Sequence, residues 1–352
     1  MGKVKVGVIG AGSISDMHLQ SYAKNEKAVV LAVCDLNEER AKAQAEKYDV
    51  AKVYNDHHKL LEDPEIEAVS ICTWNNSHAE IAIDALKAGK HVLVEKPLTT
   101  SAEKAEKVEA AVKETGKKLQ VGFVRRYDNN VQMLKRFIDN GDFGEIYYAK
   151  ASYLRRYGNP GGWFADIERS GGGPLIDLGV HVIDICWYLM GCPKVKSVSG
   201  NTYRKLGNRS NIKNLSSYKS ADYDPDKNDV EDMANALIRF ENGASLVVDV
   251  SFTLHAKKDE TSVKIYGEKG GAEVEPELLI ITEKHDTILN ATPQVDHHYF
   301  NFTQGFQNEI DAFVDYCLDE APTLSPVQHG VEMMKILRGI YESAEKGCEI
   351  QF

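Results

Sequence analysis

The feature that most constrains this chain is the alternation of short apolar runs with helical patterns over residues 1–124. Runs that are apolar on both faces and separated by helices predict a parallel sheet with both faces covered. The crossovers between its strands are expected to be right-handed. We therefore predict an N-terminal α/β domain with a doubly wound parallel sheet. Its strands are expected at Lys3–Ile9, Val29–Asp35, Ala68–Thr73, His91–Val94 and Lys118–Phe123, and its helices at Ser13–Lys24, Asn37–Tyr48, Ser77–Ala88 and Ser101–Thr115.

The rest of the chain, residues 125–352, predicts a second domain of a different kind. Its apolar runs mostly alternate with polar residues, as strands with one solvated face do. Glu241-Asn242-Gly243 lies between two such runs and predicts a hairpin turn. We predict an α+β domain on a large, mostly antiparallel open sheet, with two final helices that are able to pack back on the first domain. Strands are expected at Glu145–Arg156, Val195–Tyr203, Ala234–Phe240, Ala244–Thr253, Ser262–Tyr266, Gly271–Glu275 and Leu278–Thr282, and helices at Arg126–Asn140, Pro174–Met190, Asn301–Leu318 and Pro326–Lys346.

Composition argues against several classes of protein. The formal net charge of −11 favours neither nucleic acid nor an anionic membrane surface as a partner. No run of about 18 apolar residues is present, so no membrane span is expected. Three of the six cysteines, Cys34, Cys72 and Cys186, lie in apolar segments, and none forms a C-x-x-C pair. We expect free thiols in a reducing, cytoplasmic compartment.

Metal binding is not expected from the sequence. The adjacent pairs His57-His58 and His297-His298 are expected to point apart, and neither has cysteines nearby.

A phosphate-binding turn is predicted where the first strand ends. Gly10-Ala11-Gly12-Ser13-Ile14-Ser15 follows that strand and leads into a helix, which gives a G-x-G-x-x-S pattern. Gly10 permits the tight turn, Gly12 lets the backbone approach a pyrophosphate, and Ser15 is small enough for helix–strand packing. Free N–H groups at the helix start then face the phosphates. The residues from Gly10 to Ile14 are therefore expected to bind a dinucleotide.

Asp35 ends the second predicted strand, 23 residues after Gly12. A carboxylate near that spacing hydrogen-bonds ribose hydroxyls and repels a 2′-phosphate, so we expect NAD rather than NADP. Arg40 and Lys42 lie nearby in the sequence and weaken that preference. An ordinary turn acid at the end of a strand is the alternative.

Two further segments carry candidate catalytic groups. Glu95-Lys96-Pro97 follows a strand of the parallel set, at the edge where ligands bind in such sheets. A surface lysine before a proline is the alternative there. Asp177 and His181 lie four residues apart and share one face of a predicted helix, which Asp184 is also placed to join. Three glycines precede this helix, and Gly179 within it suggests close approach of another group.

Together these segments resemble the Gfo/Idh/MocA family, which includes glucose–fructose oxidoreductase and inositol dehydrogenases. The resemblance covers nearly the whole chain. It rests on the Gly10/Gly12 turn, on Glu95-Lys96-Pro97, on Val121-Gly122-Phe123-x-Arg125-Arg126-Tyr127, and on the glycine run leading to Asp177-x-Gly179-x-His181. Family membership implies a Rossmann domain, an open-sheet domain, a catalytic lysine at Lys96 and an Asp/His pair at Asp177 and His181. Ser15 departs from the glycine or alanine that the family often has at the third position of the turn.

The chemistry of these residues suits alcohol oxidation. Neutral His181 is suited to accept the hydroxyl proton near pH 7, while Asp177 orients the imidazole. Lys96 is suited to hold the substrate oxygen and to stabilise developing alkoxide charge. A nearby nicotinamide cation is expected to lower the pKa of Lys96. A share of Lys96 in the proton transfer is therefore an open alternative.

Other positions are assigned more loosely. Thr73, Trp74, Asn75 and Glu95 are expected to border the cofactor, and so is His78, unless it is an ordinary helix-start residue. Substrate contacts are expected from Lys96, Asp177 and His181, together with Arg125, Tyr157 and Trp163. Trp163 and Phe164 either wall the pocket or anchor their loop on the core. Of Arg155 and Arg156, alternation along a strand allows at most one to face the site.

The sequence therefore predicts an NAD-dependent oxidoreductase that acts on a secondary alcohol of a sugar, a cyclitol or a sugar derivative, and that forms a homo-oligomer, as the resemblance implies. Two alternatives remain. One is an NAD-using glycosidase that works through a transient ketone. The other is a non-catalytic NAD-sensing protein on the same fold, which the intact set of Lys96, Asp177 and His181 disfavours.

Overall fold

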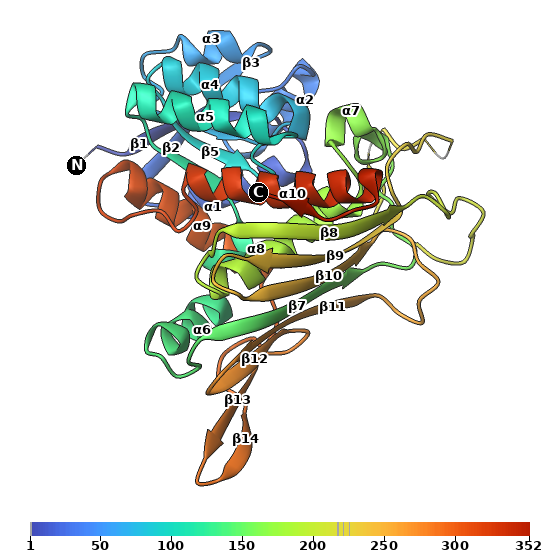
Figure 1. The fold of residues 1–352 in the computed structure, drawn as a ribbon. Coiled ribbons are helices and arrows are strands. Elements are labelled where there is room, and N and C mark those ends of the chain that lie inside the picture. The colour runs from blue at the N-terminus through green and yellow to red at the C-terminus, as the bar shows by residue number, and fades with distance from the viewer. Residues whose placement is uncertain (1, 217, 221, 225) are drawn as a thin grey trace. The chain divides into compact units, whose positions relative to one another are not determined.

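The structure is a computed structural model that describes residues 2–216, 218–220, 222–224 and 226–352 (Figure 1). The chain divides into two compact units. The first comprises residues 1–127 and 302–331, and the second comprises residues 128–301 and 332–352. The helices that close the chain thus contribute residues to the first unit as well as to the second. Across the described chain, no helix combines the length and apolar character that crossing a bilayer requires.

The first unit is built on a six-stranded parallel sheet with the strand order β3-β2-β1-β4-β5-β6. This is the order of a doubly wound dinucleotide-binding sheet, and it confirms the predicted fold class. The sequence prediction missed the short strand β3. The strands are β1 (Val4–Ile9), β2 (Ala28–Cys34), β3 (Lys52–Tyr54), β4 (Ala68–Ile71), β5 (His91–Glu95) and β6 (Leu119–Gly122).

Helices cover both faces of this sheet. One core cluster joins α1, α2 and α9 to strands β1 and β2, with Leu19, Ala41 and Phe313 fully buried in it. Figure 1 shows α4 and α5 side by side on the other face. The helices are α1 (Ser13–Lys24), α2 (Glu38–Lys47), α3 (His57–Leu61), α4 (His78–Lys87), α5 (Ala102–Thr115), α9 (Phe302–Cys317) and α10 (Val327–Lys346), together with the 3-10 turns η1 (Asn75–Ser77) and η2 (Val124–Tyr127). Of these, α10 continues into the second unit.

Local signals explain where several of these helices begin and end. The side chains of Asn37 and Ser101 accept hydrogen bonds from the N–H groups of Arg40 and Lys104, and so cap α2 and α5. Gly116 ends α5 in the left-handed conformation that glycine favours. Asn37, the first residue of the helix predicted there, is thus its cap, and α2 itself begins one residue later.

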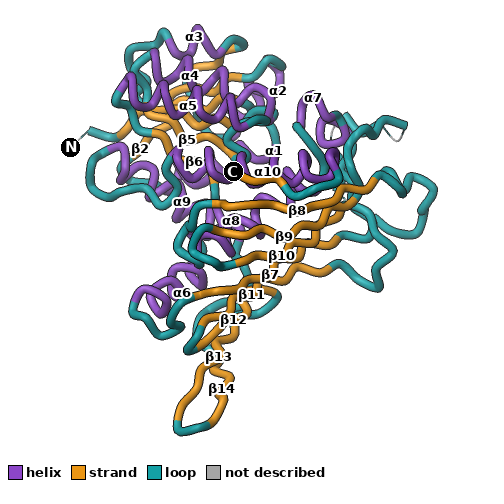
Figure 2. The backbone as a smooth tube through the Cα atoms, viewed as in Figure 1, coloured by secondary structure: helices purple, strands orange, loops and turns teal. Residues whose placement is uncertain are grey.

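The second unit is built on a nine-stranded sheet in the order β14-β13-β12-β11-β7-β10-β9-β8-β15 (Figure 2). Its described pairs are antiparallel except for the central parallel pair of β7 and β10, so the predicted mostly antiparallel sheet is confirmed. The sequence prediction missed β14 and β15. The strands are β7 (Ile146–Leu154), β8 (Val195–Tyr203), β9 (Met233–Phe240), β10 (Ser245–Ser251), β11 (Glu260–Gly267), β12 (Gly270–Glu275), β13 (Leu279–Lys284), β14 (Thr287–Ala291) and β15 (Ile350–Gln351).

One helical layer lies against this sheet. The almost fully apolar helix α8 packs on β7, β10 and β11, and all of its residues except His181 are buried. The predicted single helix over 174–190 is corrected, because its first turn is a π-helix and only the remainder is α-helical. The segment 157–173, for which no helix or strand was predicted, contains two short helical turns. The helical segments are α6 (Asn129–Asp139), η3 (Gly162–Ala165), α7 (Ile167–Ser170), η4 (Leu175–Gly179) and α8 (Val180–Leu189).

Candidate active site

The turn between β1 and α1 has the geometry of a phosphate cradle. Gly10 has φ +95°, and a Cβ atom there would lie 2.5 Å from the carbonyl oxygen of Cys72, so the turn admits only glycine. A Cβ atom on Gly12 would meet nothing within 4 Å among the described residues, so space is open beside that backbone. Ser15 is buried, and its hydroxyl donates to the carbonyl oxygen of Gly12 at 2.6 Å. A small residue at the third position therefore fits this turn.

The helix that follows leaves its N-terminus available to an anion. Within the described chain, no side chain caps α1 at Gly12. Ser13 is exposed and Ile14 is half-buried at this end of the helix. The first N–H groups of a helix lack partners inside the helix and carry positive charge. The residues present therefore fit a dinucleotide pyrophosphate.

Asp35 lies beside the same turn. Its Oδ2 atom accepts the N–H of Ala11 at 2.8 Å, and its Oδ1 atom accepts the N–H of Asn37 at 2.8 Å. Each carboxylate oxygen keeps a further lone pair, which is able to accept a ribose hydroxyl. Arg40 approaches Asp35 only to 3.8 Å from a half-exposed position. The carboxylate is thus held by the phosphate turn itself, next to which a ribose would lie.

The ends of β4 and β5 are joined by a buried histidine. His78 Nδ1 lies 2.8 Å from the carbonyl oxygen of Pro97, and its Nε2 lies 3.1 Å from that of Thr73. Burial lowers the pKa of His78, and the two carbonyls only partly oppose that effect. A neutral imidazole donates through one nitrogen, so one of these contacts is a full hydrogen bond. His78 therefore links the segment of Thr73, the exposed Trp74 and the buried Asn75 to the Glu95-Lys96-Pro97 segment.

A second buried histidine holds the same segment from α1. His18 is fully buried, and its Nε2 lies 2.8 Å from Glu95 Oε1. The other carboxylate oxygen of Glu95 accepts the N–H of Lys96 at 3.2 Å. A Cβ atom on Gly122 would lie 3.3 Å from the Glu95 carboxyl carbon, so the glycine leaves room for it. The sequence analysis did not identify His18, although its position three residues after Ser15 on α1 points to this strand end.

Arginine 125 and its neighbour lie at the end of β6. Both side chains are buried. The Arg126 guanidinium donates to the carbonyl oxygen of Leu324 and contacts His329 Nδ1, each at 2.7 Å. Burial and the Arg126 charge lower the pKa of His329 to about 4. These contacts of Arg126 are all made within the first unit. Arg125 is therefore the remaining candidate for substrate contact.

In the second unit, the π-helical turn η4 and helix α8 present Asp177 and His181. In the stretch 172–190, which is described without gaps, these two residues alone are not buried. Asp184 is buried, so the prediction that it might join this face is corrected. π-Helical turns inside α-helices occur frequently at functional sites. The structure therefore exposes one carboxylate and one imidazole from an otherwise apolar segment.

A buried glutamate that the sequence analysis missed supports the start of this segment. Glu231 accepts the N–H groups of Gly173 and Leu175, at 2.8 and 3.2 Å, and the Tyr341 hydroxyl at 2.7 Å. A Cβ atom on Gly172 would lie 2.0 Å from the Tyr341 hydroxyl oxygen, so the glycine run is required by packing. Glu231 is 58 residues from Gly173, and no local sequence signal pointed to it.

Of the two arginines after β7, Arg155 is electrostatically coupled to Asp177. Burial is the largest effect on the pKa of Arg155 and lowers it, but Tyr153, Asp177 and Asp259 together raise it. Arg156 instead donates to the carbonyl oxygen of Lys257 at 2.8 Å. The two side chains thus have different partners. The predicted strand over 145–156 ends at Leu154, so strand alternation does not decide which arginine faces the site.

The loop after β7 contains the remaining candidates of this unit. The Tyr157 hydroxyl donates to the carbonyl oxygen of Ile212 at 3.2 Å. The rings of Trp163 and Phe164 lie 3.9 Å apart, and both side chains are half-buried. These contacts leave both interpretations of Trp163 open, as pocket wall and as loop anchor.

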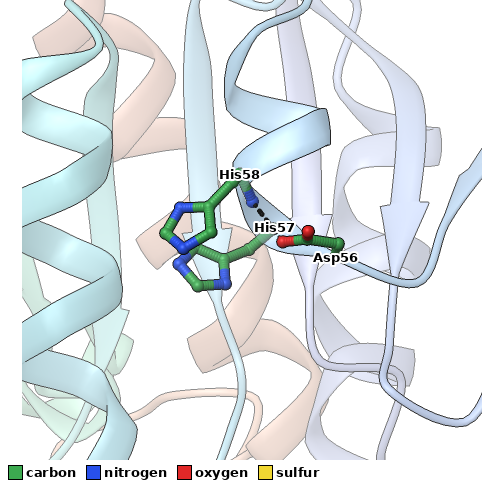
Figure 3. A group of neighbouring side chains, drawn as sticks. All are labelled: Asp56, His57 and His58. Carbon is green, nitrogen blue, oxygen red and sulfur yellow. Dashed lines mark hydrogen bonds between the residues drawn. The ribbon is translucent and has the colours of Figure 1, made fainter.

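The prediction that His57 and His58 point apart is wrong. Their ring centroids lie 4.0 Å apart, and Figure 3 shows the two rings on the same side of the chain. They lie at the start of α3, after Asp56, whose side chain caps that helix.

Comparisons with known proteins follow the same division of the chain. Residues 4–123 match the Gfo/Idh/MocA oxidoreductase family model with an NAD-binding Rossmann fold, and residues 131–273 match the Gfo/Idh/MocA C-terminal domain. The chain is 31% identical to D-glucoside 3-dehydrogenase of Escherichia coli K12, over 99% of this chain and 97% of that protein. It is 33% identical to the NAD+-dependent scyllo-inositol 2-dehydrogenase of Bacillus subtilis 168, over 90% and 84% of the two chains. A levoglucosan dehydrogenase complexed with NADH and L-sorbose has a similar structure, with a TM-score of 0.86 and 25% identity over 100% of this chain and 99% of that one.

Proposed function

This chain belongs to the Gfo/Idh/MocA oxidoreductase family, and from that premise we propose that it is an NAD-dependent dehydrogenase of sugars, cyclitols or sugar derivatives. The relatives named above act on a glucoside, an inositol and levoglucosan, which supports a polyhydroxylated substrate with a secondary alcohol. Asp35 next to the phosphate turn supports NAD over NADP as the cofactor.

The observation that carries this proposal is the accessibility of Asp177 and His181 within a buried stretch. Partly exposed polar groups on an apolar helical segment are available to a substrate. His181 is suited to take the hydroxyl proton, with Asp177 orienting its imidazole and stabilising its charged form.

Lys96 is proposed to hold the substrate oxygen and to stabilise its developing negative charge. The peptide that carries it is held by Glu95 and His18 on one side and by Pro97 and His78 on the other. We assign His18 and His78 as positioning residues, which act through the Lys96 backbone. When bound, NAD supplies the hydride acceptor at its nicotinamide ring.

The remaining predicted contacts are proposals of the same kind. Gly10, Gly12, Ser13, Ile14 and Asp35 are assigned to the pyrophosphate and ribose of NAD. Cofactor contacts nearer the nicotinamide are assigned to Thr73, Trp74, Asn75, Glu95 and Lys96, whereas His78 is assigned to positioning. Substrate contacts beyond the catalytic groups are assigned to Arg125, Tyr157 and Trp163.

The test is turnover of a substrate panel of D-glucosides, inositols and levoglucosan with NAD, followed by NADH absorbance. We expect turnover of at least one compound, and Lys96→Ala and His181→Phe should each lower it by about 10²- to 10⁴-fold. NADH affinity, measured by fluorescence, should persist in His181→Phe. Unchanged turnover in either variant contradicts its assigned role. Cleavage of a glycoside without net NADH accumulation would instead favour the NAD-using glycosidase.

We also propose that the chain forms a homo-oligomer through the open face of its nine-stranded sheet. Tyr148 and Tyr266 stack on neighbouring strands with centroids 5.3 Å apart, and the cross-strand pair Leu237 and Val247 is only half-buried. Apolar groups on a solvated sheet face favour association. Light scattering should give a mass above that of one chain, and Tyr266→Lys should lower it.

The acidic net charge supports small molecules rather than nucleic acid or anionic membranes as partners. All six cysteines are free thiols, which supports a reducing, cytoplasmic compartment.

A further inference from the structure

Two adjacent histidines at the start of α3 converge on one carboxylate of α4. His57 Nε2 lies 3.2 Å from Asp84 Oδ2, and His58 Nδ1 lies 3.8 Å from the same oxygen. The two imidazole rings lie against each other at 41° (Figure 3). Ring nitrogens of both histidines also lie within 4.8 Å of each other and of an Asp56 carboxylate oxygen. Both histidines therefore lie beside two carboxylates, that of Asp84 on α4 and that of Asp56 at the start of α3.

The spacing of these atoms suits a small divalent ion. In a tetrahedral zinc site with bonds of about 2.0–2.1 Å, neighbouring donor atoms lie about 3.3 Å apart. The two nitrogen–oxygen distances here, 3.2 and 3.8 Å, lie close to that value.

Hydrogen bonding at the start of α3 leaves ligand atoms available to an ion. A neutral imidazole keeps one unprotonated ring nitrogen, and a carboxylate keeps further lone pairs. Asp56 keeps its role as the cap of α3, because its Oδ1 atom accepts the His58 N–H at 2.9 Å. That hydrogen bond holds the first turn of α3, on which both histidines lie.

We propose that His57 and His58, together with the neighbouring carboxylates of Asp56 and Asp84, bind a divalent transition-metal ion of the zinc class. Imidazole with one carboxylate suits zinc, copper or nickel better than magnesium or calcium, which prefer all-oxygen sites. The side chains of His57, His58 and Asp84 are 20%, 59% and 32% exposed, so an ion reaches them from solvent and water completes its coordination. This site links α3 to α4 and is independent of the proposed dehydrogenase function.

The consequence is stabilisation of the first unit by mass action. An ion that binds only the folded chain raises the thermal midpoint with its concentration. Because α3 and α4 come from separate parts of the sequence, the ion acts as a cross-link between them. Activity is not expected to depend on it.

The test titrates metal-free full-length chain with zinc by calorimetry and follows the thermal midpoint. The exposed thiol of Cys348 is removed by Cys348→Ser in every variant, because it would bind zinc on its own. We expect one zinc ion per chain, a rising midpoint with zinc, and no rise with magnesium. His57→Gln, His58→Gln and Asp84→Asn should each weaken zinc binding at least tenfold.

The matched control is the other adjacent pair, His297→Gln with His298→Gln, which removes two histidines in the second unit. This double variant should bind zinc as the parent does. Equal loss in the control, or unchanged binding in the His57 and His58 variants, overturns the proposal. Cobalt added to the unaltered chain should shift the imidazole NMR signals of His57 and His58 first. This NMR test uses the unaltered chain, so it still decides the proposal if a variant fails to fold. If the signals of other histidines shift first, His57 and His58 are not the ligands.

Discussion

The two units hold their candidate catalytic groups by different means. In the first unit, Lys96 lies on a strand-end segment that is held by two buried histidines, His18 and His78. In the second unit, Asp177 and His181 lie on a π-helical turn and the helix after it, and the start of this segment is held by Glu231 and Tyr341.

The difference lies in where the supporting residues come from. The supports of Lys96 belong to α1 and α4, which join neighbouring strands of one parallel sheet. His18 lies 77 positions from Glu95, but both belong to regular elements of that sheet. The supports of the Asp177 segment are Glu231, which lies outside any helix or strand and 56 or 58 positions from the residues it holds, and Tyr341. Regular topology therefore supports the first segment, whereas a contact from an irregular segment supports the second. Four predictions test this difference, in order of decreasing effect.

The largest effect is expected at the phosphate turn. Gly10→Ala places a Cβ atom 2.5 Å from the Cys72 carbonyl oxygen at φ +95°, and should lower the free energy of unfolding by roughly 4 kcal/mol. Gly12→Ala meets open space, so stability should hold while NADH affinity falls at least tenfold. Denaturant unfolding and NADH fluorescence measure the two effects. Normal NADH binding by Gly12→Ala would show that the open space is not used by a pyrophosphate.

The matching test in the second unit removes its buried carboxylate. Glu231→Ala leaves two buried N–H groups and the Tyr341 hydroxyl without their acceptor, and should cost about 3 kcal/mol. Turnover should fall, while NADH affinity stays unchanged because Glu231 does not belong to the dinucleotide-binding unit. Glu231→Gln, which keeps one acceptor oxygen, should restore part of the turnover. If NADH affinity also fell in Glu231→Ala, the two sites would not be supported independently of each other.

The third prediction concerns acid stability of the first unit. Burial, Lys117 and Lys118 lower the pKa of His91 from 6.5 to about 4, and burial with Arg126 does the same to His329. Between these values the unfolded chain binds protons that the folded chain does not, so stability is present above pH 6.5 and is lost as pH falls towards 4. Each histidine contributes at most about 2 kcal/mol after solvent screening.

His91→Gln and His329→Gln should therefore flatten the pH dependence of unfolding measured between pH 7 and pH 5. The control is His255→Gln with His285→Gln, two exposed histidines of the second unit, which should leave the slope as it is. If the slope changed only in the control variant, the acid-sensitive groups would lie in the second unit, and the prediction would be wrong.

The smallest effect separates two neighbouring arginines. Arg155→Met should lower turnover about tenfold, because Asp177 loses a neighbouring positive charge. Arg156→Met should leave turnover unchanged, since its guanidinium contacts only the Lys257 carbonyl among the hydrogen bonds described. Steady-state kinetics on the two variants decides the point, and equal losses would mean that Asp177 does not depend on Arg155.

Sequence patterns predicted most of the fold and the candidate residues, but not their supports. Strand–helix alternation located five of the six strands of the parallel sheet, and the glycine spacing located the turn. The three-residue strand β3 escaped because it is too short to show a period. The π-helical turn also escaped, because residues four apart share a face in a helix of either type.

Strand periodicity and short motifs are encoded between near neighbours, so the sequence alone predicted the class of both domains and named Lys96, Asp177 and His181 as candidate catalytic residues. The folded structure was needed to show that Glu231 and Tyr341 hold the glycine run. It was also needed to show that His18 and His78 hold the lysine segment, and that His57 and His58 approach Asp84. Those arrangements depend on side chains that meet only after distant segments pack, so no local pattern records them.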